Sequence, residues 1–390
     1  MKTPKRRKLF IEAVPLVDKQ ISGIPHALAG IVAAMAANPT IQERFEIVLV
    51  VPGSRMHLLD RWRGLENCTR KAIPMKFRIM NGLARRNLLP PMDLLLGPGI
   101  YFFGNFFSWA LTKRSRSFTM IHDVCFAVHP ELVQPENQRM LQKNVPRFIR
   151  QTDEIVTVSE HAKSEIQTYF RVPNDKITVV YNGVNRELYK PYPATEVEKV
   201  KKKYGLGGRK YFIFIGNIEP RKNLERLTEA MMKLPKDYAL IMIGSDGWLN
   251  EKVFANIKEA NAKGHMIIKP HTYVDDDDVV RLLSGATALV QPSVYEGFGL
   301  PALEALVAEV PLVAAGIPPL HEIGGEAAFY FDPYNVDAMA TAMKKATTLT
   351  AKERQERISK GLVRAKQFTW EKAAERLAKK FVAADQALRP

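Results

Sequence analysis

The feature that most constrains this chain is a repeated alternation between short apolar runs and helical patterns. In the first half the apolar runs are KLFIEAVPL, EIVLVVPG, SFTMIH, EIVTVS and ITVVYN, and a helix is expected from Ile24 to Ala37. In the second half they are YFIFIG, YALIMIG, HMIIKP, TALVQPS, VPLVAA and FYF, with helical stretches between them. This alternation is typical of βαβ units, in which helices join buried parallel strands. The sequence therefore predicts an α/β protein with parallel sheets.

Length and one interruption of the pattern indicate two domains. A chain of 390 residues is too long for one ordinary hydrophobic core. The alternation stops in the charged, proline-bearing stretch KPYPATEVEKVKKKYGLGGRK and restarts directly after it. We therefore predict a Rossmann-like domain over 1–190, a linker over 191–210, a second Rossmann-like domain over 211–369 and a C-terminal helix over 370–390. The two domains are expected to face a central cleft.

Composition narrows the class and the compartment. The chain is 46% hydrophobic and 25% charged, which is an ordinary globular balance. Its two cysteines, Cys68 and Cys125, provide no disulfide framework and fit a reducing compartment, so a cytoplasmic protein is expected. The most apolar segment, IYFFGNFFSWAL, is much shorter than the roughly 20 residues that span a bilayer. No membrane-spanning segment is therefore expected.

Positive charge is concentrated in the first half. Residues 1–195 carry 28 Lys and Arg against 16 Asp and Glu, within a net charge of +16 for the chain. Such a field could face nucleic acid, an anionic membrane or an acidic substrate, or it could simply be solvated. No aromatic–basic recognition motif or zinc module favours nucleic acid.

The stretch IYFFGNFFSWAL is followed by Lys113, Arg114 and Arg116, and this combination bears on membrane binding. Basic residues beside exposed aromatic side chains can hold a protein on an anionic membrane surface. The alternative is that the aromatic side chains fill the core and the charges are solvated. Peripheral attachment to a membrane therefore depends on whether these aromatic side chains are exposed.

The most informative stretch is VYEGFGLPALEA, which follows TALVQPS and enters a helix near Gly299. Open parallel sheets bind ligands at the carboxyl ends of their strands, and a helix start offers N–H groups to a phosphate there. Glu296 lies ahead of the helix and Glu304 more than one turn inside it, so one carboxylate can meet a sugar and the other a ribose. Read without the motif, both would be surface charges at a helix start.

Two cations follow another strand of the second half. Arg221 and Lys222 come after YFIFIG at the beginning of a helix, where they could neutralise a diphosphate leaving group. Gly216 ends the same run, so the backbone there can approach a ligand closely. Charge compensation of this kind would take the place of a metal ion. The alternative is a solvated Arg–Lys pair at a turn.

A histidine stands at a strand end in the first half. His122 closes the run SFTMIH and precedes Asp123. A histidine in this position can hydrogen-bond a transferred sugar or an incoming acceptor. Asp123 could orient the imidazole or stabilise positive charge on a sugar. Taken alone, a histidine at a strand end is more often a structural residue.

The sequence also lacks a GxGxxG after a strand and a GxxxxGK[ST], which removes the usual nicotinamide-binding and P-loop classes.

Taken in order, these stretches resemble one family of enzymes. EGFGLPALEA resembles the E-x7-E signature of the large retaining family-4 glycosyltransferases, which share the two-domain GT-B fold. FIFIGNIEPRKNLERLTEA is similar to the family's donor-phosphate segment, and TMIHDVCFAVHPEL to its active-site histidine segment. IVTVSEHAKSEI and ITVVYNGVN resemble the end of the first domain, and FTWEKAAERL resembles the terminal helix that crosses back onto that domain.

The resemblance implies transfer of a hexose from a nucleotide-sugar donor with retention of anomeric configuration, without a metal or other cofactor. The residues expected to be catalytic are His122, Glu296, Arg221 and Lys222. Those expected to bind the donor are Gly23, Asp123, Gly216, Tyr273, Phe298, Gly299, Leu300 and Glu304. The family's usual double glycine is reduced to Ser22–Gly23. Many members carry an arginine where this chain has Asn217, so Arg221 is expected to take over that role.

The aspartates from Asp275 to Asp278 contain the DxD spacing that glycosyltransferases of another fold use for manganese. They also open the helical stretch VVRLLSGA, where acidic residues favour the positive end of the helix dipole. We therefore expect helix capping here. No other cluster has the spacing of a metal site.

The donor, the acceptor and the reaction leave alternatives. IEPRKN and the IHD segment are most similar to mannosyl- and rhamnosyltransferases of bacterial surface polysaccharides, which favours GDP-mannose as donor. A glycan or lipid-linked saccharide is the expected acceptor, and the latter would bring the enzyme to the inner face of the cell membrane. A nucleotide-sugar epimerase of the same fold is one alternative. A non-catalytic nucleotide-sugar-binding protein is another, and it would tolerate loss of His122 and Glu296.

Overall fold

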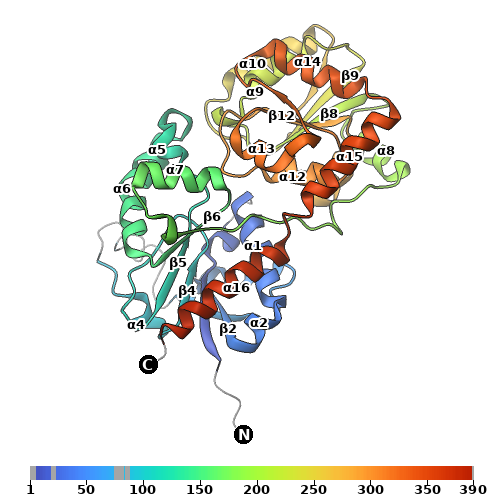
Figure 1. Ribbon diagram of the computed structural model, residues 1–390. Helices are drawn as coiled ribbons and strands as arrows, with labels where there is room; N and C mark the ends of the chain where they lie inside the picture. Colours follow the sequence, from blue (N-terminus) through green and yellow to red (C-terminus); the bar gives the residue numbers. More distant parts are fainter. Residues whose placement is uncertain (1–5, 19–22, 74–82, 84–87, 389–390) are drawn as a thin grey trace. The chain divides into compact units, whose positions relative to one another are not determined.

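The computed structural model describes residues 6–18, 23–73, 83 and 88–388 (Figure 1). The chain forms two compact units. The first comprises Met1–Val128, Glu136–Gly183 and Thr369–Pro390, and the second comprises His129–Pro135 and Val184–Phe368. Among the residues described, no helix has both the length and the apolar character needed to cross a bilayer.

The first unit is built on a parallel sheet. Its strands lie in the order β3-β2-β1-β4-β5-β6-β7, so the chain reverses its direction of winding between β1 and β4. The strands are β1 (Arg7–Glu12), β2 (Phe45–Pro52), β3 (Thr69–Ile73), β4 (Ile100–Phe103), β5 (Arg116–Met120), β6 (Glu154–Thr157) and β7 (Ile177–Val179). The helices are α1 (Gly23–Ala37), α2 (Pro39–Arg44), α4 (Met92–Leu96), α5 (Cys125–Val128), α6 (Pro135–Gln151), α7 (Glu160–Phe170) and α16 (Trp370–Gln386).

The second unit repeats this plan. Its strand order, β10-β9-β8-β11-β12-β13, again reverses between the first strand, β8, and the fourth, β11. The strands are β8 (Lys210–Ile215), β9 (Tyr238–Ile243), β10 (Met266–Ile268), β11 (Ala288–Gln291), β12 (Leu312–Ala315) and β13 (Phe329–Phe331). The helices are α8 (Ala194–Lys203), α9 (Leu224–Met231), α10 (Glu251–Ala262), α11 (Asp276–Ser284), α12 (Leu300–Val307), α13 (Pro318–Gly324), α14 (Val336–Thr347) and α15 (Ala351–Ala365).

Both sheets therefore have the Rossmann-like strand order, as predicted. The apolar runs form strands because parallel strands are covered by helices on both faces and bury both rows of side chains. All the runs singled out in the sequence become strands. The 3₁₀ helices of the described residues lie at Val14–Val17, Gly53–Arg61, Pro130–Leu132, Asn174–Lys176, Pro220–Lys222 and Gly325–Ala327.

Of the two alternatives for the aromatic stretch IYFFGNFFSWAL, the structure supports the one in which its aromatic side chains fill the core. Ile100–Phe103 is strand β4, which lies in the middle of the first sheet between β1 and β5. The ring of Tyr101 stacks on that of Phe10 with centroids 4.6 Å apart, and Trp109 is buried in the same hydrophobic cluster. These aromatic side chains fill the core because β4 has a neighbouring strand on each side.

The stretch expected to be a linker, 191–210, contains helix α8 and is grouped with the second unit. Glu196 on α8 forms an ion pair with Arg281 on α11 at 2.8 Å. Lys203 reaches Asp278 at the start of α11 at 2.5 Å, and the hydroxyl of Tyr204 donates to the same carboxylate at 2.7 Å. The charges that suggested a linker thus pair across two adjacent helices.

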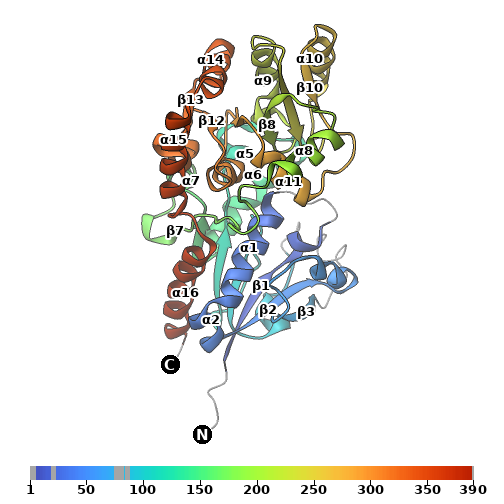
Figure 2. The same ribbon diagram turned by 90° about the vertical axis from the view of Figure 1, so that its right-hand side faces the viewer.

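The C-terminal helix α16 returns to the first unit, as predicted. It lies beside α1 and α2 in both views, red against blue (Figures 1 and 2). The approach is close, because a Cβ built on Gly30 of α1 would meet the Trp370 ring at 2.4 Å. Phe381 on α16 is fully buried, and its ring centroid lies 4.9 Å from that of Phe118 on β5. Helix α16 therefore completes the core of the first unit.

Candidate active site

The residues expected to bind the donor phosphates follow β8 and β11, the two strands at which the second sheet reverses its winding. This reversal point is where open α/β sheets bind ligands. Gly216 follows β8 with a φ of 149°, and a Cβ there would lie 3.1 Å from the Phe214 ring and 3.7 Å from Lys222 Cε. The backbone after β8 thus turns tightly next to the Lys222 side chain.

Asn223 fixes the turn that carries Arg221 and Lys222. It has a left-handed φ of 58°, which asparagine tolerates better than most residues. Its Nδ2 donates to the carbonyl of Pro292 at 3.0 Å and to that of Pro333 at 2.7 Å. The turn after β8 is therefore tied to the loop after β11, which carries Glu296.

Glu296 is the centre of a buried polar cluster. Its Oε1 accepts hydrogen bonds from Lys222 Nζ at 2.6 Å, Gln291 Nε2 at 2.6 Å and Ser293 Oγ at 2.8 Å. Its Oε2 accepts from Arg221 Nη1 at 3.2 Å. The structure thus brings together three of the four residues expected to be catalytic, and Glu296 and Lys222 are only 5% and 7% exposed.

The electrostatics of this cluster favour an ionised carboxylate. Burial alone would raise the pKa of Glu296, but the charges of Lys222 and Arg221 outweigh it and lower the pKa to about 2. Burial, and next the charge of Arg221, lower the pKa of Lys222 below its ordinary value, while Glu296 opposes that change. Because Arg221 is half-exposed and also pairs with Glu219 at 2.6 Å, it is bound less tightly to Glu296 than Lys222 is.

Helix α12 begins directly beyond this cluster. Its N-cap is Gly299, with a φ of 107°, and no side chain caps the helix start. A Cβ at Gly299 would meet Leu320 at 2.7 Å, so a side chain is excluded there by space as well as by conformation. Phe298 is buried against Phe368, with ring centroids 5.9 Å apart. The start of α12 at Leu300 therefore presents backbone amides beside Glu296, as a phosphate-binding helix start requires.

Glu304 lies on α12 and has a partner that sequence reasoning missed. The Tyr189 hydroxyl donates a hydrogen bond to its carboxylate, and Asp276 lies close enough to repel that charge. Burial chiefly raises the pKa of Glu304 to about 7, with the Tyr189 hydrogen bond opposing the rise. Tyr189 falls within the predicted first domain, 1–190, but the structure groups it with the second unit. Its position just after ITVVYNGVN was the only signal available.

Tyr273, expected near the nucleotide base, is 67% exposed on the loop before α11. Its hydroxyl donates to Asp276 Oδ1 at 3.1 Å. Because Asp276 also acts on Glu304, the structure places Tyr273, Asp276 and Glu304 in one part of the second unit. An exposed aromatic ring of this kind can stack on a base.

The raised pKa of Glu304 leads to a pH prediction for nucleotide binding. If the ionised carboxylate accepts hydrogen bonds from ribose hydroxyls, affinity is full above pH 7 and falls as the carboxyl becomes protonated below it. With a pKa of about 7, the ionised fraction and the affinity should fall about tenfold from pH 8 to pH 6. Calorimetric titration of a nucleoside diphosphate across this range measures the slope. The Glu304→Gln variant should bind the nucleoside diphosphate weakly and with an affinity that does not change with pH. An unchanged pH dependence in this variant would exclude Glu304 as its source.

In the first unit, His122 follows β5 and is buried. Its Nε2 lies 3.2 Å from the carbonyl oxygen of Gly104, which follows β4. Burial lowers the pKa of His122 to about 4, so the imidazole is neutral at neutral pH. Because a carbonyl can only accept, Nε2 carries the proton and Nδ1 is left as an acceptor. His122 can therefore accept a hydrogen bond from a sugar hydroxyl.

Asp123 and Gly23 occupy the same edge of the first sheet. Asp123 Oδ1 accepts from the Cys125 N–H at 3.0 Å at the start of α5, so part of its role is to fix this turn. Gly23 is the first residue of α1, and a Cβ there would meet nothing within 4 Å. Ser22, the other half of the expected glycine-type loop, lies outside the described residues.

Glu12, which sequence analysis did not single out, ends β1 at this edge. It is buried, and its carboxylate accepts from the Val14 N–H at 3.2 Å. Burial raises the pKa of Glu12 to about 7. A glutamate inside the apolar run KLFIEAVPL was the available signal, because a charged residue in a buried strand requires a reason.

The aspartates lie at the start of α11, where acidic residues favour the positive end of the helix dipole, but Asp275 at the N-cap makes no side-chain capping hydrogen bond. Asp276, Asp277 and Asp278 lie in the first turn, and Asp278 is paired with Lys203 and Tyr204. Across the part of the chain that the structure describes, no group of three or more His, Cys, Asp or Glu side chains is arranged to hold a metal ion.

Comparison with known proteins agrees with this arrangement. Residues 31–188 match the model for glycosyltransferase family 4, and residues 196–362 match that for glycosyl transferases group 1. The chain is 33% identical over 263 residues to O-antigen chain mannosyltransferase B of Escherichia coli, covering 66% of this chain and 68% of that protein. It is 26% identical over 237 residues to O-antigen chain mannosyltransferase RfbU of Salmonella typhimurium, covering 60% of this chain and 62% of that protein.

Solved structures share the fold at low identity. Sucrose-phosphate synthase from Thermosynechococcus elongatus superimposes with a TM-score of 0.74 at 15% identity, covering 98% of this chain and 100% of that one. HepE of Anabaena, in complex with UDP-glucose, superimposes with a TM-score of 0.73 at 15% identity, covering 97% and 100%.

The two Rossmann-like sheets and the returning C-terminal helix define the GT-B class of sugar-transferring enzymes. Within that class, the chain belongs to the group 1, family 4 glycosyltransferases, which are retaining enzymes that use nucleotide-sugar donors.

Proposed function

We propose that this enzyme transfers mannose or a related hexose from GDP-mannose to a glycan or a lipid-linked saccharide. The observation that carries the proposal is the Glu296–Lys222–Arg221 cluster at the carboxyl ends of β8 and β11. It combines a carboxylate suited to sugar hydroxyls with two cations suited to a diphosphate. The matched mannosyltransferases of O-antigen chains favour mannose and a surface polysaccharide.

In this proposal each element of the second unit has a role toward the donor. Lys222 and Arg221, with the start of α12, neutralise the diphosphate as the bond between the sugar and its phosphate oxygen breaks. Glu296 accepts hydrogen bonds from the sugar hydroxyls, Glu304 binds the ribose and Tyr273 stacks near the base. The backbone at Gly216 and at Phe298 to Leu300 approaches the phosphates.

The acceptor is assigned to the first unit. His122 accepts a hydroxyl hydrogen bond through Nδ1, and Asp123 holds the adjacent turn and stabilises positive charge. The backbone at Gly23 is assigned to the diphosphate by the family resemblance alone. The acceptor oxygen forms its bond to the anomeric carbon on the face that the phosphate leaves, and a departing phosphate oxygen takes the acceptor proton. This front-face course accounts for retention without a covalent enzyme intermediate.

A thermal-shift panel followed by a transfer assay tests the proposal. A ligand that binds only the folded state raises the melting temperature by mass action. GDP and GDP-mannose are expected to give the largest shifts among nucleotides and nucleotide sugars, and labelled mannose should pass to a saccharide acceptor. Release of free or epimerised sugar without transfer would instead support an epimerase. Binding without any turnover would support a non-catalytic protein.

The proposal also predicts that transfer needs no divalent metal. Lys222, Arg221 and the α12 dipole supply the charge compensation that a metal provides elsewhere. Activity in excess EDTA should therefore stay within about twofold of the untreated enzyme. A collapse of activity that manganese restores would contradict this and would return attention to Asp275–Asp278.

A lipid-linked acceptor would bring the enzyme to an anionic membrane, and we propose helix α4 as the part of the first unit that contacts it. Leu94 and Leu95 on α4 are 62% and 42% exposed. The neighbouring Asp93 accepts from the Thr112 N–H at 2.9 Å, which places this helix beside the exposed Lys113 and Arg114. Exposed leucines next to basic residues suit a membrane surface.

Vesicle binding tests this membrane contact. Binding should require anionic lipid and weaken as salt rises, and Lys113→Ala/Arg114→Ala should weaken it by about ten- to thirtyfold, from about 1 kcal/mol per basic residue. Lys344→Ala/Lys345→Ala removes two exposed charges from α14 in the other unit and serves as the control. Equal effects of both double variants, or no binding at low salt, would leave a soluble acceptor as the better choice.

A further inference from the structure

A basic pocket lies at the amino-terminal edge of the second sheet. Its volume is about 280 Å³. Lys210 begins β8, Tyr238 begins β9, and Thr287 directly precedes β11. Gly216, Lys222 and Glu296 follow the other ends of β8 and β11, so the pocket lies across the sheet from the proposed donor site.

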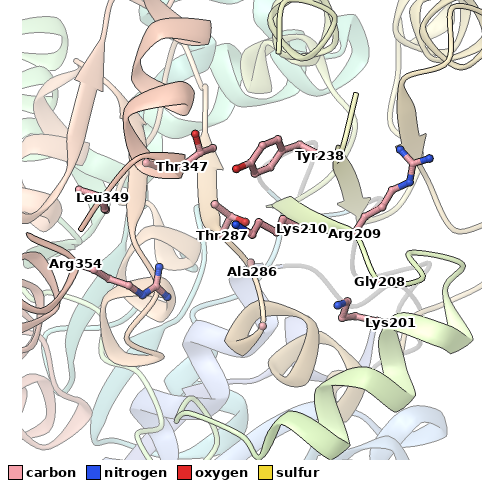
Figure 3. Close-up of a pocket in the computed structure, with 12 residues that line it drawn as sticks. Lys201, Gly208, Arg209, Lys210, Tyr238, Ala286, Thr287, Thr347, Leu349 and Arg354 are labelled. Atoms are coloured by element: carbon pink, nitrogen blue, oxygen red, sulfur yellow. The ribbon is translucent and has the colours of Figure 1, made fainter. Parts of the chain in front are cut away.

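All charged residues that line this pocket are cations. Lys201, Arg209, Lys210 and Arg354 contribute to the lining, which contains no Asp or Glu. Figure 3 shows Arg354 projecting from one side and Lys201 from the other, with Lys210 and Thr287 between them. Two of the four cations are already engaged: Lys201 pairs with Glu198 at 2.5 Å, and Arg209 Nη1 donates to the Lys236 carbonyl at 2.5 Å.

The other two cations, and two hydroxyls, are free to bind a ligand. Among the described residues, the side chains of Arg354, Lys210, Thr287 and Tyr238 have no hydrogen-bond or ion-pair partner. Arg354 is half-buried, and this burial lowers its pKa below the ordinary value for arginine. Free donors of this kind converge on one small concave space.

Arg354 also stands where local rules disfavour a cation. It lies in the first turn of α15, whose N-cap Thr350 forms a capping box with Glu353. The N-terminal end of a helix carries partial positive charge and favours anions. Burial and the helix end therefore both act against the Arg354 charge. A residue that breaks a local rule with no compensation in the protein is expected at a functional site.

We propose that this pocket is a second ligand site, which binds the phosphate group of a small soluble phosphorylated molecule. A bound phosphate would compensate Arg354 and Lys210 and accept hydrogen bonds from Thr287 and Tyr238. The volume is just below the usual range of small-molecule sites, and suits a phosphate or a sugar phosphate better than a whole nucleotide sugar. The site is independent of the proposed donor chemistry, because it uses the opposite edge of the sheet.

Calorimetric titration with inorganic pyrophosphate tests the site in the full-length enzyme. The donor site is first saturated with GDP or UDP, whichever gives the larger thermal shift, so that pyrophosphate can bind only elsewhere. One further binding event is expected at low salt. Arg354→Gln and Lys210→Gln should each weaken it by about tenfold or more, as expected for losing a charge-assisted hydrogen bond.

Matched variants control for charge alone. Arg376→Gln removes an exposed arginine from α16, and Lys258→Gln removes an exposed lysine from α10. Neither lines the pocket, and both should leave pyrophosphate binding unchanged. The melting temperature of unliganded Arg354→Gln should not fall, because that residue is uncompensated in the free protein. Lys210 is exposed and lies outside α15, so Lys210→Gln tests pyrophosphate binding without disturbing that helix.

Three results would overturn the proposal. The first is the absence of pyrophosphate binding to the nucleotide-saturated enzyme at low salt. The second is equal weakening by the pocket variants and their controls. The third is binding only to vesicles that contain phosphatidic acid, which would assign the pocket to a lipid headgroup.

Discussion

Replacement of Lys222 by methionine is expected to reduce turnover by about 100- to 1,000-fold, the usual effect of removing one group that stabilises developing charge. Lys222 is buried and bonded to Glu296 at 2.6 Å, so no other side chain can move into its place easily. Methionine retains most of the buried volume. Nucleoside diphosphate affinity should also fall, which calorimetry measures directly.

Two comparisons make this result interpretable. Arg221→Met should reduce turnover less than Lys222→Met does, because Arg221 is half-exposed and pairs with Glu219 as well as with Glu296. Lys258→Met, which changes an exposed lysine on α10, should leave turnover and affinity unchanged. Thermal melting identifies any unfolded fraction. Turnover of Lys222→Met within about threefold of the wild type would remove Lys222 from the donor-phosphate role.

Replacing the two glutamates should separate sugar recognition from nucleotide recognition. Glu304→Ala should weaken nucleoside diphosphate binding by about ten- to a hundredfold, as expected for hydrogen bonds to a charged partner. Glu296→Ala should leave that affinity nearly intact, because Lys222 and Arg221 are then free for the diphosphate, but it should abolish most transfer. Equal losses of bare nucleotide affinity in both variants would contradict this division of roles.

Glu296→Ala should also lose stability in a defined pH window. The pKa of Glu296 is lowered from 4.5 to about 2 in the folded chain. The stabilisation that follows is therefore fully present above pH 4.5 and is lost as the pH falls toward 2. Unfolding by urea should show the deficit of the variant at pH 7 and a smaller deficit near pH 3. Because Glu296→Ala is expected to be less stable, its transfer activity and nucleotide affinity should be measured where thermal melting shows the variant to be folded.

The sequence predicted most strands because buried parallel strands leave long apolar runs that few other structures produce. It did not predict β4, because IYFF continues into GNFFSW without a break that marks the strand end. The linker was predicted over α8 because a charged, proline-bearing stretch interrupts the alternation of strands and helices there. The partners of the α8 side chains, Asp278 and Arg281, lie far away in the chain.

The same limit applies to the site. Glu296, Lys222 and Arg221 could be named from local motifs, and the structure places them in contact. The contributions of Gln291 and Ser293 could not be named, because a polar residue at the end of a strand does not reveal which carboxylate it will meet. Tyr189 meets Glu304 across more than a hundred residues of sequence, so only the folded chain shows that pair.

Helix α16 gives the chain an unusual order of assembly on the ribosome. Phe381 packs among Phe45, Phe102 and Phe118, which come from three strands made early in synthesis. The whole segment Val184–Phe368 must be translated before that ring exists, a delay of roughly 10 to 40 s at ordinary elongation rates. The unit that begins the chain is thus the last to close its core, and during that interval its sheet is exposed to chaperones and proteases.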